Sequence, residues 1–137
     1  MKRAIRLAFS CLTMASLLAC GGGEPTTTIL RTLPNDRGFL ADGSEYFSYQ
    51  PGPGASKILD ALLRDAGIRA GNKRCAKDTG VFAGQMVVFI EGIYPRYALY
   101  DIPVSDLAKA RQLAFIEYLP EMDFIGTPFW RCEDQGY

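Results

Sequence analysis

The sequence predicts a small α+β domain that combines an antiparallel sheet with two helices. Residues 56–66 and 105–114 carry apolar side chains at the spacing of an amphipathic helix. Runs rich in aromatic and β-branched residues lie around them, as expected for strands. The chain has no internal repeat and only one segment with the composition of a linker, so we expect a single domain over residues 36–137.

The first half of this domain contains one predicted strand and one predicted helix. Asp42-Gly43 favours a turn, and the aromatic run at residues 45–49 predicts a strand. After the interruption at residues 51–54 (PGPG), Ser56 is suited to cap a helix and Gly67 to end it. The apolar positions of this helix are Ile58, Leu59, Leu62, Leu63 and Ala66. We expect residues 69–80 to form a loop.

The second half continues with three strands and a helix. Residues 85–91 (QMVVFIE) are apolar at both alternations, which predicts a strand in the centre of the sheet. A turn at residues 92–95 leads to a returning antiparallel strand at 96–102, and residues 115–119 form the last strand. Between them Ser105 caps the second helix, with Asp106 in its first turn. Its inner face carries Leu107, Ala110, Leu113 and Ala114.

The predicted elements follow the order strand, helix, strand, strand, helix, strand. This order resembles the split βαβ arrangement of ferredoxin-like domains.

The first nineteen residues have the parts of an export signal. Lys2, Arg3 and Arg6 supply the positive start, and an apolar run follows that is too short to span a bilayer comfortably. At its end, residues 17–20 (LLAC) resemble the lipobox of bacterial lipoproteins. The resemblance implies that Cys20 carries a diacylglycerol and becomes the first residue of the mature protein. The alternative is an ordinary secretory signal with an incidental cysteine.

The segment after Cys20 has the composition of a tether. Residues 21–28 (GGGEPTTT) contain no large apolar side chain, so we expect residues 20–35 to be flexible and to lift the domain off the lipid. Gly21 stands where the enterobacterial inner-membrane retention pattern has an aspartate. We therefore expect the outer membrane, with the domain facing the periplasm.

The folded part is slightly acidic. The whole chain has fifteen basic and fifteen acidic residues, and removal of Lys2, Arg3 and Arg6 with the signal leaves a net charge of −3. A domain of this charge has no electrostatic reason to bind nucleic acid. We interpret the basic residues at positions 64–77 and the acidic residues at positions 117–134 as solvated surface.

Cys75 and Cys132 are the cysteines of the predicted domain. In an oxidising compartment the simplest expectation is that they form a disulfide. The chain has no CxxC motif for a redox site, and it offers too few nitrogen and sulfur ligands for a zinc site.

The residues that catalysis most often uses are missing. The chain has no histidine, and it contains no nucleophile elbow, no serine-lysine motif and no phosphate-binding glycine loop. We therefore assign no catalytic residue and expect no metal or cofactor. A hydrolase could still use two carboxylates. The candidates are Asp42, Glu45, Glu91, Asp101 and Glu117.

Aromatic residues are the most informative feature for binding. Tyrosine and tryptophan are enriched in surfaces that recognise proteins, because they combine a large apolar ring with a polar group. Tyr94 stands at a predicted loop tip beside Pro95 and Arg96, a composition typical of binding hot spots. The other candidates for the binding surface are Tyr46, Tyr49 and Trp130.

Three functions are compatible with these residues. The preferred hypothesis is a non-enzymatic lipoprotein that binds another envelope protein, as accessory or toxin-neutralising lipoproteins do. The second is a lipoprotein that binds glycan or peptidoglycan fragments through aromatic and acidic side chains. The third is a carboxylate-dependent hydrolase.

Overall fold

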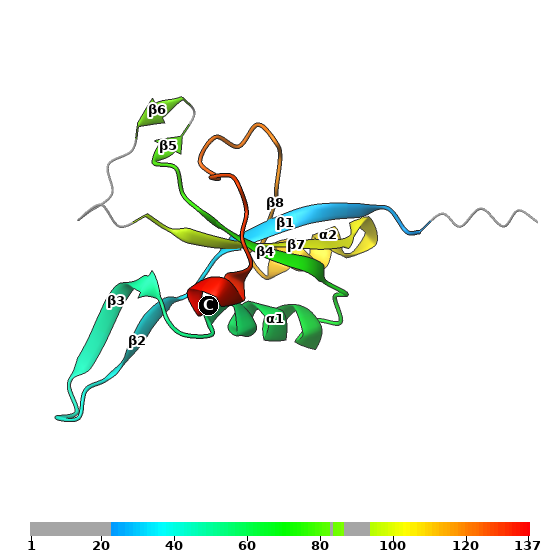
Figure 1. Cartoon of the computed structure of the whole chain (residues 1–137). Helices are drawn as coiled ribbons and strands as arrows, with labels where there is room; N and C mark the ends of the chain where they lie inside the picture. The colour runs from blue at the N-terminus through cyan, green and yellow to red at the C-terminus, as the bar shows by residue number, and fades with distance from the viewer. Residues whose placement is uncertain (1–22, 83, 87–93) are drawn as a thin grey trace, which may run out of the picture.

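The computed structural model describes residues 23–82, 84–86 and 94–137, and its centre is an open four-stranded sheet. The strands are β1 (Thr26–Thr32), β4 (Gly71–Lys77), β7 (Arg96–Pro103) and β8 (Ile116–Glu117). Their order is β4-β7-β1-β8, and every neighbouring pair is antiparallel (Figure 1). With the helices α1 (Ala55–Asp65) and α2 (Leu107–Gln112), the described part confirms the predicted α+β class.

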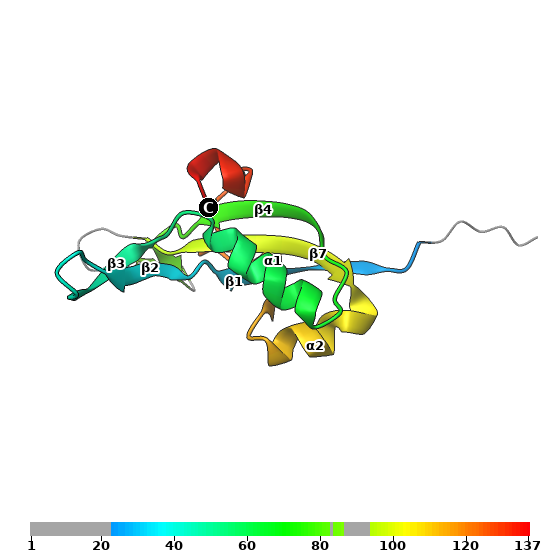
Figure 2. The same cartoon turned by 90° about the horizontal axis from the view of Figure 1, so that it is seen from below.

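One face of the sheet packs against both helices, which Figure 2 shows in front of the strands. The buried cluster on this face includes Ile29, Ala98, Tyr100, Leu59, Leu63 and Ala110. Leu59 and Leu63 are almost completely buried, and burying a leucine side chain contributes about 1.5–3 kcal/mol. The predicted helix at residues 56–66 is therefore held mainly by its apolar face.

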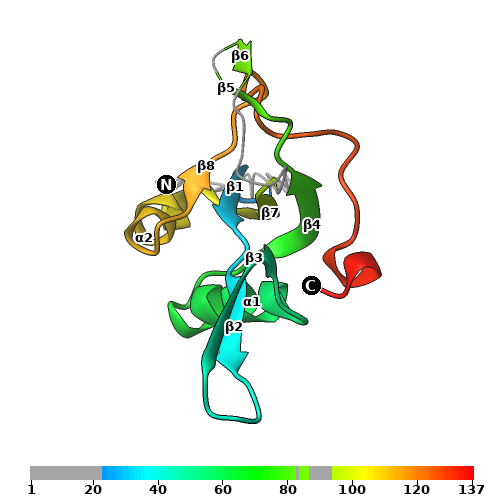
Figure 3. The ribbon, with the colours of Figure 1, turned by 90° about the vertical axis from the view of Figure 1, so that its left-hand side faces the viewer.

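The opposite face is covered by the segment of residues 118–130. Leu30, Ala76 and Leu99 of the sheet form a second buried cluster with Ile125 of this segment. In Figure 3 the C-terminal segment passes along the outer side of β4. Isolated β-bridges join it there to Cys75 and Asp78.

A two-stranded hairpin projects from the body at the end of β1 (Figures 1 and 3). It consists of β2 (Asn35–Phe39) and β3 (Glu45–Pro51). In its turn the Asp42 carboxylate accepts hydrogen bonds from the backbone N–H and the hydroxyl of Ser44, which lower the pKa of Asp42. The predicted strand at 45–49 is thus confirmed, but it belongs to this hairpin and not to the main sheet.

The predicted tether over residues 20–35 is wrong from Thr26 onward. β1 lies inside the main sheet between β7 and β8. Ile29 and Leu30 are buried on its two faces, and their burial stabilises the strand although threonines precede them. The chain therefore enters the fold much earlier than its composition indicates.

The predicted loop at residues 69–80 is also wrong, because β4 occupies most of it. Cys75 and Ala76 are fully buried, and pairing with β7 outweighs the weak strand propensity of glycine, asparagine and lysine. Of the predicted central strand at 85–91, the described part is β6 (Gln85–Met86), which pairs only with β5 (Val81–Phe82). Residues 87–91 of that prediction lie outside the described residues.

The ends of the first helix differ in part from the prediction. Ser56 is not the cap: α1 follows Gly54, whose φ is 71°, and Ser56 lies inside the first turn with no exposed surface. Ile58 is 55% exposed and does not join the core. Gly67 follows the helix with φ 70° and donates its N–H to the Arg64 carbonyl, as its predicted role at the helix end requires.

The second helix begins later than predicted. Ser105 lies in a 3-10 turn, η2 (Val104–Asp106), and makes no capping hydrogen bond. Ala110 is buried as expected, whereas Ala114 is exposed with φ 60° and lies beyond the helix. The strand predicted at 96–102 is confirmed as β7, and of the strand at 115–119 only β8 forms.

Candidate functional site

A cavity of about 670 Å³ lies where β4 ends, and it contains two of the predicted binding residues. Tyr94 lines it from the segment before β7, and Trp130 lines it from the C-terminal segment. Lys77, the last residue of β4, also contributes. We call this cavity the Tyr94 groove; its lining residues are Lys77, Asp78, Thr79, Tyr94, Gly126, Thr127, Pro128 and Trp130.

Lys77 and Tyr94 form one wall of the groove. The Lys77 ammonium lies 4.9 Å from the centre of the Tyr94 ring, a cation–π contact that contributes about 0.5–1 kcal/mol at an exposed site. Lys77 is exposed and forms no ion pair with any of the described residues. The groove therefore presents a positive charge next to an aromatic ring.

Tyr94, Pro95 and Arg96 are half-buried, unlike residues of a free loop tip. The Pro95 carbonyl accepts a 2.9 Å hydrogen bond from the Asp78 N–H, and the Arg96 guanidinium donates to the Tyr94 carbonyl. These bonds hold the Tyr94 backbone against the end of β4. The predicted binding residues are thus in place, but as part of a supported wall.

The opposite wall is the C-terminal segment, held against β4 by backbone hydrogen bonds. Cys75 and Trp130 exchange two of them, at 2.7 and 3.1 Å, and Gly126 donates to the Lys77 carbonyl at 2.8 Å. A Cβ atom on Gly126 would lie only 2.8 Å from that same oxygen, so this close approach needs a glycine. The Trp130 indole N–H is shielded from solvent and has no acceptor among the described residues.

Asp78 supports the groove and does not offer a free carboxylate. It is 7% exposed, and it accepts hydrogen bonds from the Tyr97 hydroxyl at 2.8 Å and from the Gly80 N–H at 2.7 Å. Burial, followed by this bond to Asp78, raises the pKa of Tyr97 well above its usual value. Tyr97 therefore stays protonated and keeps Asp78 in place.

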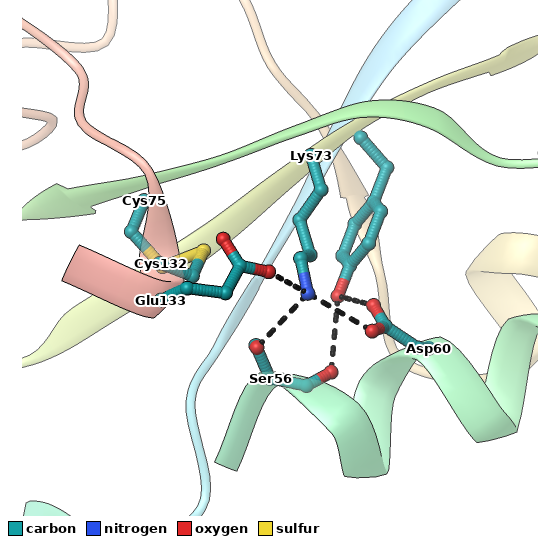
Figure 4. The surroundings of a disulfide bond; sticks show 7 residues. Ser56, Asp60, Lys73, Cys75, Cys132 and Glu133 are labelled. Carbon is teal, nitrogen blue, oxygen red and sulfur yellow. Dashed lines mark hydrogen bonds and ion pairs between the residues drawn. A yellow bond between two sulfur atoms is a disulfide. The ribbon is translucent and has the colours of Figure 1, made fainter. Parts of the chain in front are cut away.

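The C-terminal end is attached to the sheet by the Cys75–Cys132 disulfide and by Lys73 (Figure 4). The Lys73 ammonium lies 2.7 Å from a Glu133 oxygen and 3.0 Å from an Asp60 oxygen. Burial opposes the charge on Lys73, but the two carboxylates outweigh it and raise its pKa. The hydrogen bond from Lys73 lowers the pKa of Glu133. We call these contacts, together with the disulfide, the C-terminal clasp.

The C-terminal clasp has the residues of a serine–lysine dyad but not its chemistry. Lys73 donates to the Ser56 hydroxyl at 3.2 Å, yet its raised pKa prevents it from acting as a base. Ser56 has no exposed surface, so a substrate cannot reach it. The Tyr100 hydroxyl, which donates to Asp60 at 2.8 Å, completes a network whose groups bind one another. A cavity of about 710 Å³ borders this network.

The described carboxylate candidates do not form a catalytic pair. Asp101 accepts hydrogen bonds from Arg74, Thr28 and Asn72. Burial would raise the pKa of Asp101, but these bonds outweigh it and lower that pKa. Glu117 is opposite Ile29 in the register, whereas Asp101 is opposite Thr28, so they lie on different faces of the sheet.

The remaining predicted residues lie elsewhere. Asp42 and Glu45 belong to the hairpin, and Tyr46 and Tyr49 are on its strand β3, away from the elements that form the Tyr94 groove. Cys20 and Glu91 lie outside the described residues. Sequence reasoning missed Lys77 and Gly126 as groove residues, because only the pairing of β4 with β7 and with the C-terminal segment brings them to Tyr94.

Comparisons with protein-family models, with curated proteins and with solved structures give no match. In the described part of the chain, neither helix is long and apolar enough to cross a membrane. The same residues contain no cluster of three or more histidine, cysteine, aspartate or glutamate side chains that could hold a metal ion. The functional argument therefore depends on the geometry of the Tyr94 groove and on the N-terminal sequence.

Proposed function

We propose that this chain is a lipid-anchored binding protein of the bacterial outer membrane that faces the periplasm and engages another envelope protein. The lipobox-like residues 17–20 support the acylation of Cys20. The ion pairs and hydrogen bonds of the described carboxylates favour binding over catalysis, because each group that could act as an acid or base in the C-terminal clasp is already engaged.

The Tyr94 groove is the observation that carries this proposal. Tyr94 and Trp130 are distant in the sequence, yet they line the same cavity together with the exposed Lys77. Aromatic and basic side chains around a supported concave surface are typical of the hot spots at which proteins bind each other. The function of the groove is to receive an extended segment of the partner.

The lysine indicates what that segment contains. Because Lys77 is in no ion pair with a described residue, an acidic side chain of the partner would gain a salt bridge there. The neighbouring Tyr94 ring offers an apolar surface for the side chain that follows. We therefore expect an acidic residue next to an apolar one in the bound segment.

Partner capture from the native host tests this function. The acylated protein would be cross-linked in intact cells, and captured proteins compared for the wild type, Tyr94→Ala and Lys77→Ala. Lys57→Ala is the matched control, since this exposed lysine lies on α1, away from the Tyr94 groove. We expect one envelope protein to be lost with both groove variants and kept with the control. A set of captured proteins that is the same in all four proteins would contradict the proposal.

Glycan binding is the second candidate, and the presence of two aromatic residues in one groove favours it. Tyrosine and tryptophan rings stack on the apolar faces of sugars as well as on protein side chains. Purified muropeptides, titrated while the fluorescence of Trp130 is followed, distinguish the two ligands. Saturable binding that Tyr94→Ala abolishes would favour the glycan over the protein partner.

The finer topology is part of the same proposal. We propose a ferredoxin-like split βαβ arrangement, in which the chain order β1-α1-β4-β7-α2-β8 combines with the sheet order β4-β7-β1-β8. In support, both helices contribute to the cluster on one face of the sheet. An experimental structure with a left-handed crossover between β1 and β4 would contradict it.

A further inference from the structure

The chain is attached to the body of the domain as early as Glu24. One oxygen of its carboxylate lies 2.9 Å from the Arg69 guanidinium, and the other accepts a hydrogen bond from the Ser105 hydroxyl. The next carbonyl, that of Pro25, accepts a 2.9 Å hydrogen bond from the Val104 N–H. Three segments of the fold therefore hold the start of β1, namely the loop after α1, η2 and the end of β7.

Only three glycines separate Cys20 from Glu24. A chain spans at most about 3.6 Å per residue, so the two Cα atoms are at most about 14 Å apart in any conformation. A protein acylated at Cys20 must therefore keep its Glu24 end within this distance of the lipid headgroups. This reach is far shorter than that of the sixteen-residue tether that the composition predicts.

The Tyr94 groove and the hairpin lie at the other end of the sheet. β1 runs away from Glu24, and its register pairs Thr26 with Pro103 and Thr32 with Tyr97. Seven strand residues rise by about 20 Å, which separates the two ends. The hairpin starts just beyond β1 and extends further in the same direction, as Figure 1 shows.

We infer that the end formed by Glu24, Arg69 and Val104 is a membrane-contact surface, and that the Tyr94 groove and the hairpin point away from the bilayer. The inference rests on the acylation of Cys20 in the proposed function. The partner of this surface is the headgroup layer of a phospholipid membrane. The Arg69 side chain is 80% exposed and Val104 is 45% exposed, so a cation and an apolar group face that layer together.

Tether length, and not net charge, sets this orientation. Arg69 is paired with Glu24, and the nearby Lys109 is paired with Asp106 at 2.9 Å. This end therefore carries balanced charges, and its attraction to anionic lipids is small. A short covalent attachment holds it at the membrane without such attraction.

Fluorescence quenching at two positions tests the inference. The mature chain would be attached through Cys20 to a maleimide phospholipid, because Cys75 and Cys132 are paired and leave Cys20 as the reactive thiol. In a Trp130→Phe background, Val104→Trp and Ala41→Trp place a single tryptophan at the membrane-contact surface or in the exposed hairpin turn. The vesicles contain phosphatidylethanolamine, phosphatidylglycerol and a lipid with a nitroxide on its headgroup.

We expect at least twofold stronger quenching in the Val104→Trp variant than in the Ala41→Trp variant. A ten-residue glycine–serine insertion between Gly23 and Glu24 should remove most of this difference, because it lets the body turn. Equal quenching, stronger quenching at position 41, or a difference that survives the insertion would overturn the inference. Chemical coupling makes the result independent of natural acylation, which intact-mass analysis of protein from the native host tests separately.

Discussion

Removal of the Cys75–Cys132 disulfide should destabilise the domain by about 4 kcal/mol. The bond closes a loop with a sequence separation of 57 residues. In the chain-entropy model, such a loop restricts the unfolded chain by about 14 cal/mol/K, which corresponds to about 4 kcal/mol at 25 °C. Domains of this size have a free energy of unfolding of about 5–15 kcal/mol, so the disulfide contributes a large share.

Urea unfolding of the mature chain measures this effect. At an m value of about 1.5 kcal/mol/M, the midpoint of the Cys75→Ser/Cys132→Ser double variant should lie roughly 2–3 M below that of the wild type. Trp130 is the only tryptophan and lies two residues from Cys132, so its fluorescence reports on the C-terminal segment. Far-ultraviolet circular dichroism reports on the whole domain.

The two signals should separate in the double variant. The wall of the Tyr94 groove then depends on backbone hydrogen bonds and on the Lys73–Glu133 pair, so the fluorescence transition should come at lower urea than the circular dichroism transition. A reducing agent should shift the wild type toward the variant and leave the variant unchanged. A midpoint within about 0.5 M of the wild type, where the corresponding free energy is below about 1 kcal/mol, would refute the reasoning.

Three further predictions concern the core, the groove and a buried ion pair. Leu59→Ala should cost about 2–5 kcal/mol in urea unfolding, whereas its neighbour Ile58→Ala should change stability by less than about 0.5 kcal/mol, because Leu59 is 2% and Ile58 55% exposed; equal costs would contradict the packing of α1. Gly126→Ala should cost about 1–3 kcal/mol and change the fluorescence of Trp130, since the new methyl group would clash with the Lys77 carbonyl; an unchanged protein would show that this contact is not close. Asp101→Asn should cost about 1–3 kcal/mol at pH 7, because it weakens the bonds to Arg74. The folded-state pKa of Asp101 is lowered, so its contribution is present above about pH 4 and is lost as the pH falls through the lowered pKa; a cost that stays constant down to pH 2 would contradict this origin.

The binding residues show how far sequence reasoning extends. Tyr94 and Trp130 could be selected from their residue type and local context, because aromatic rings near turns are uncommon unless they pack or bind. That they share a cavity could not be predicted. The C-terminal segment reaches Tyr94 only because it pairs with the outer edge of β4, a strand whose glycine, asparagine and lysines give no strand signal.

The sequence by itself determined the features that depend on local patterns or on residue types. These are the α+β class, the amphipathic helix α1, strand β7 and the pairing of Cys75 with Cys132. Tertiary structure decided where the chain enters the fold, because Thr26–Thr32 becomes an inner strand through long-range pairing and burial of Ile29 and Leu30. Such contacts join residues distant in the chain, and no local propensity encodes them.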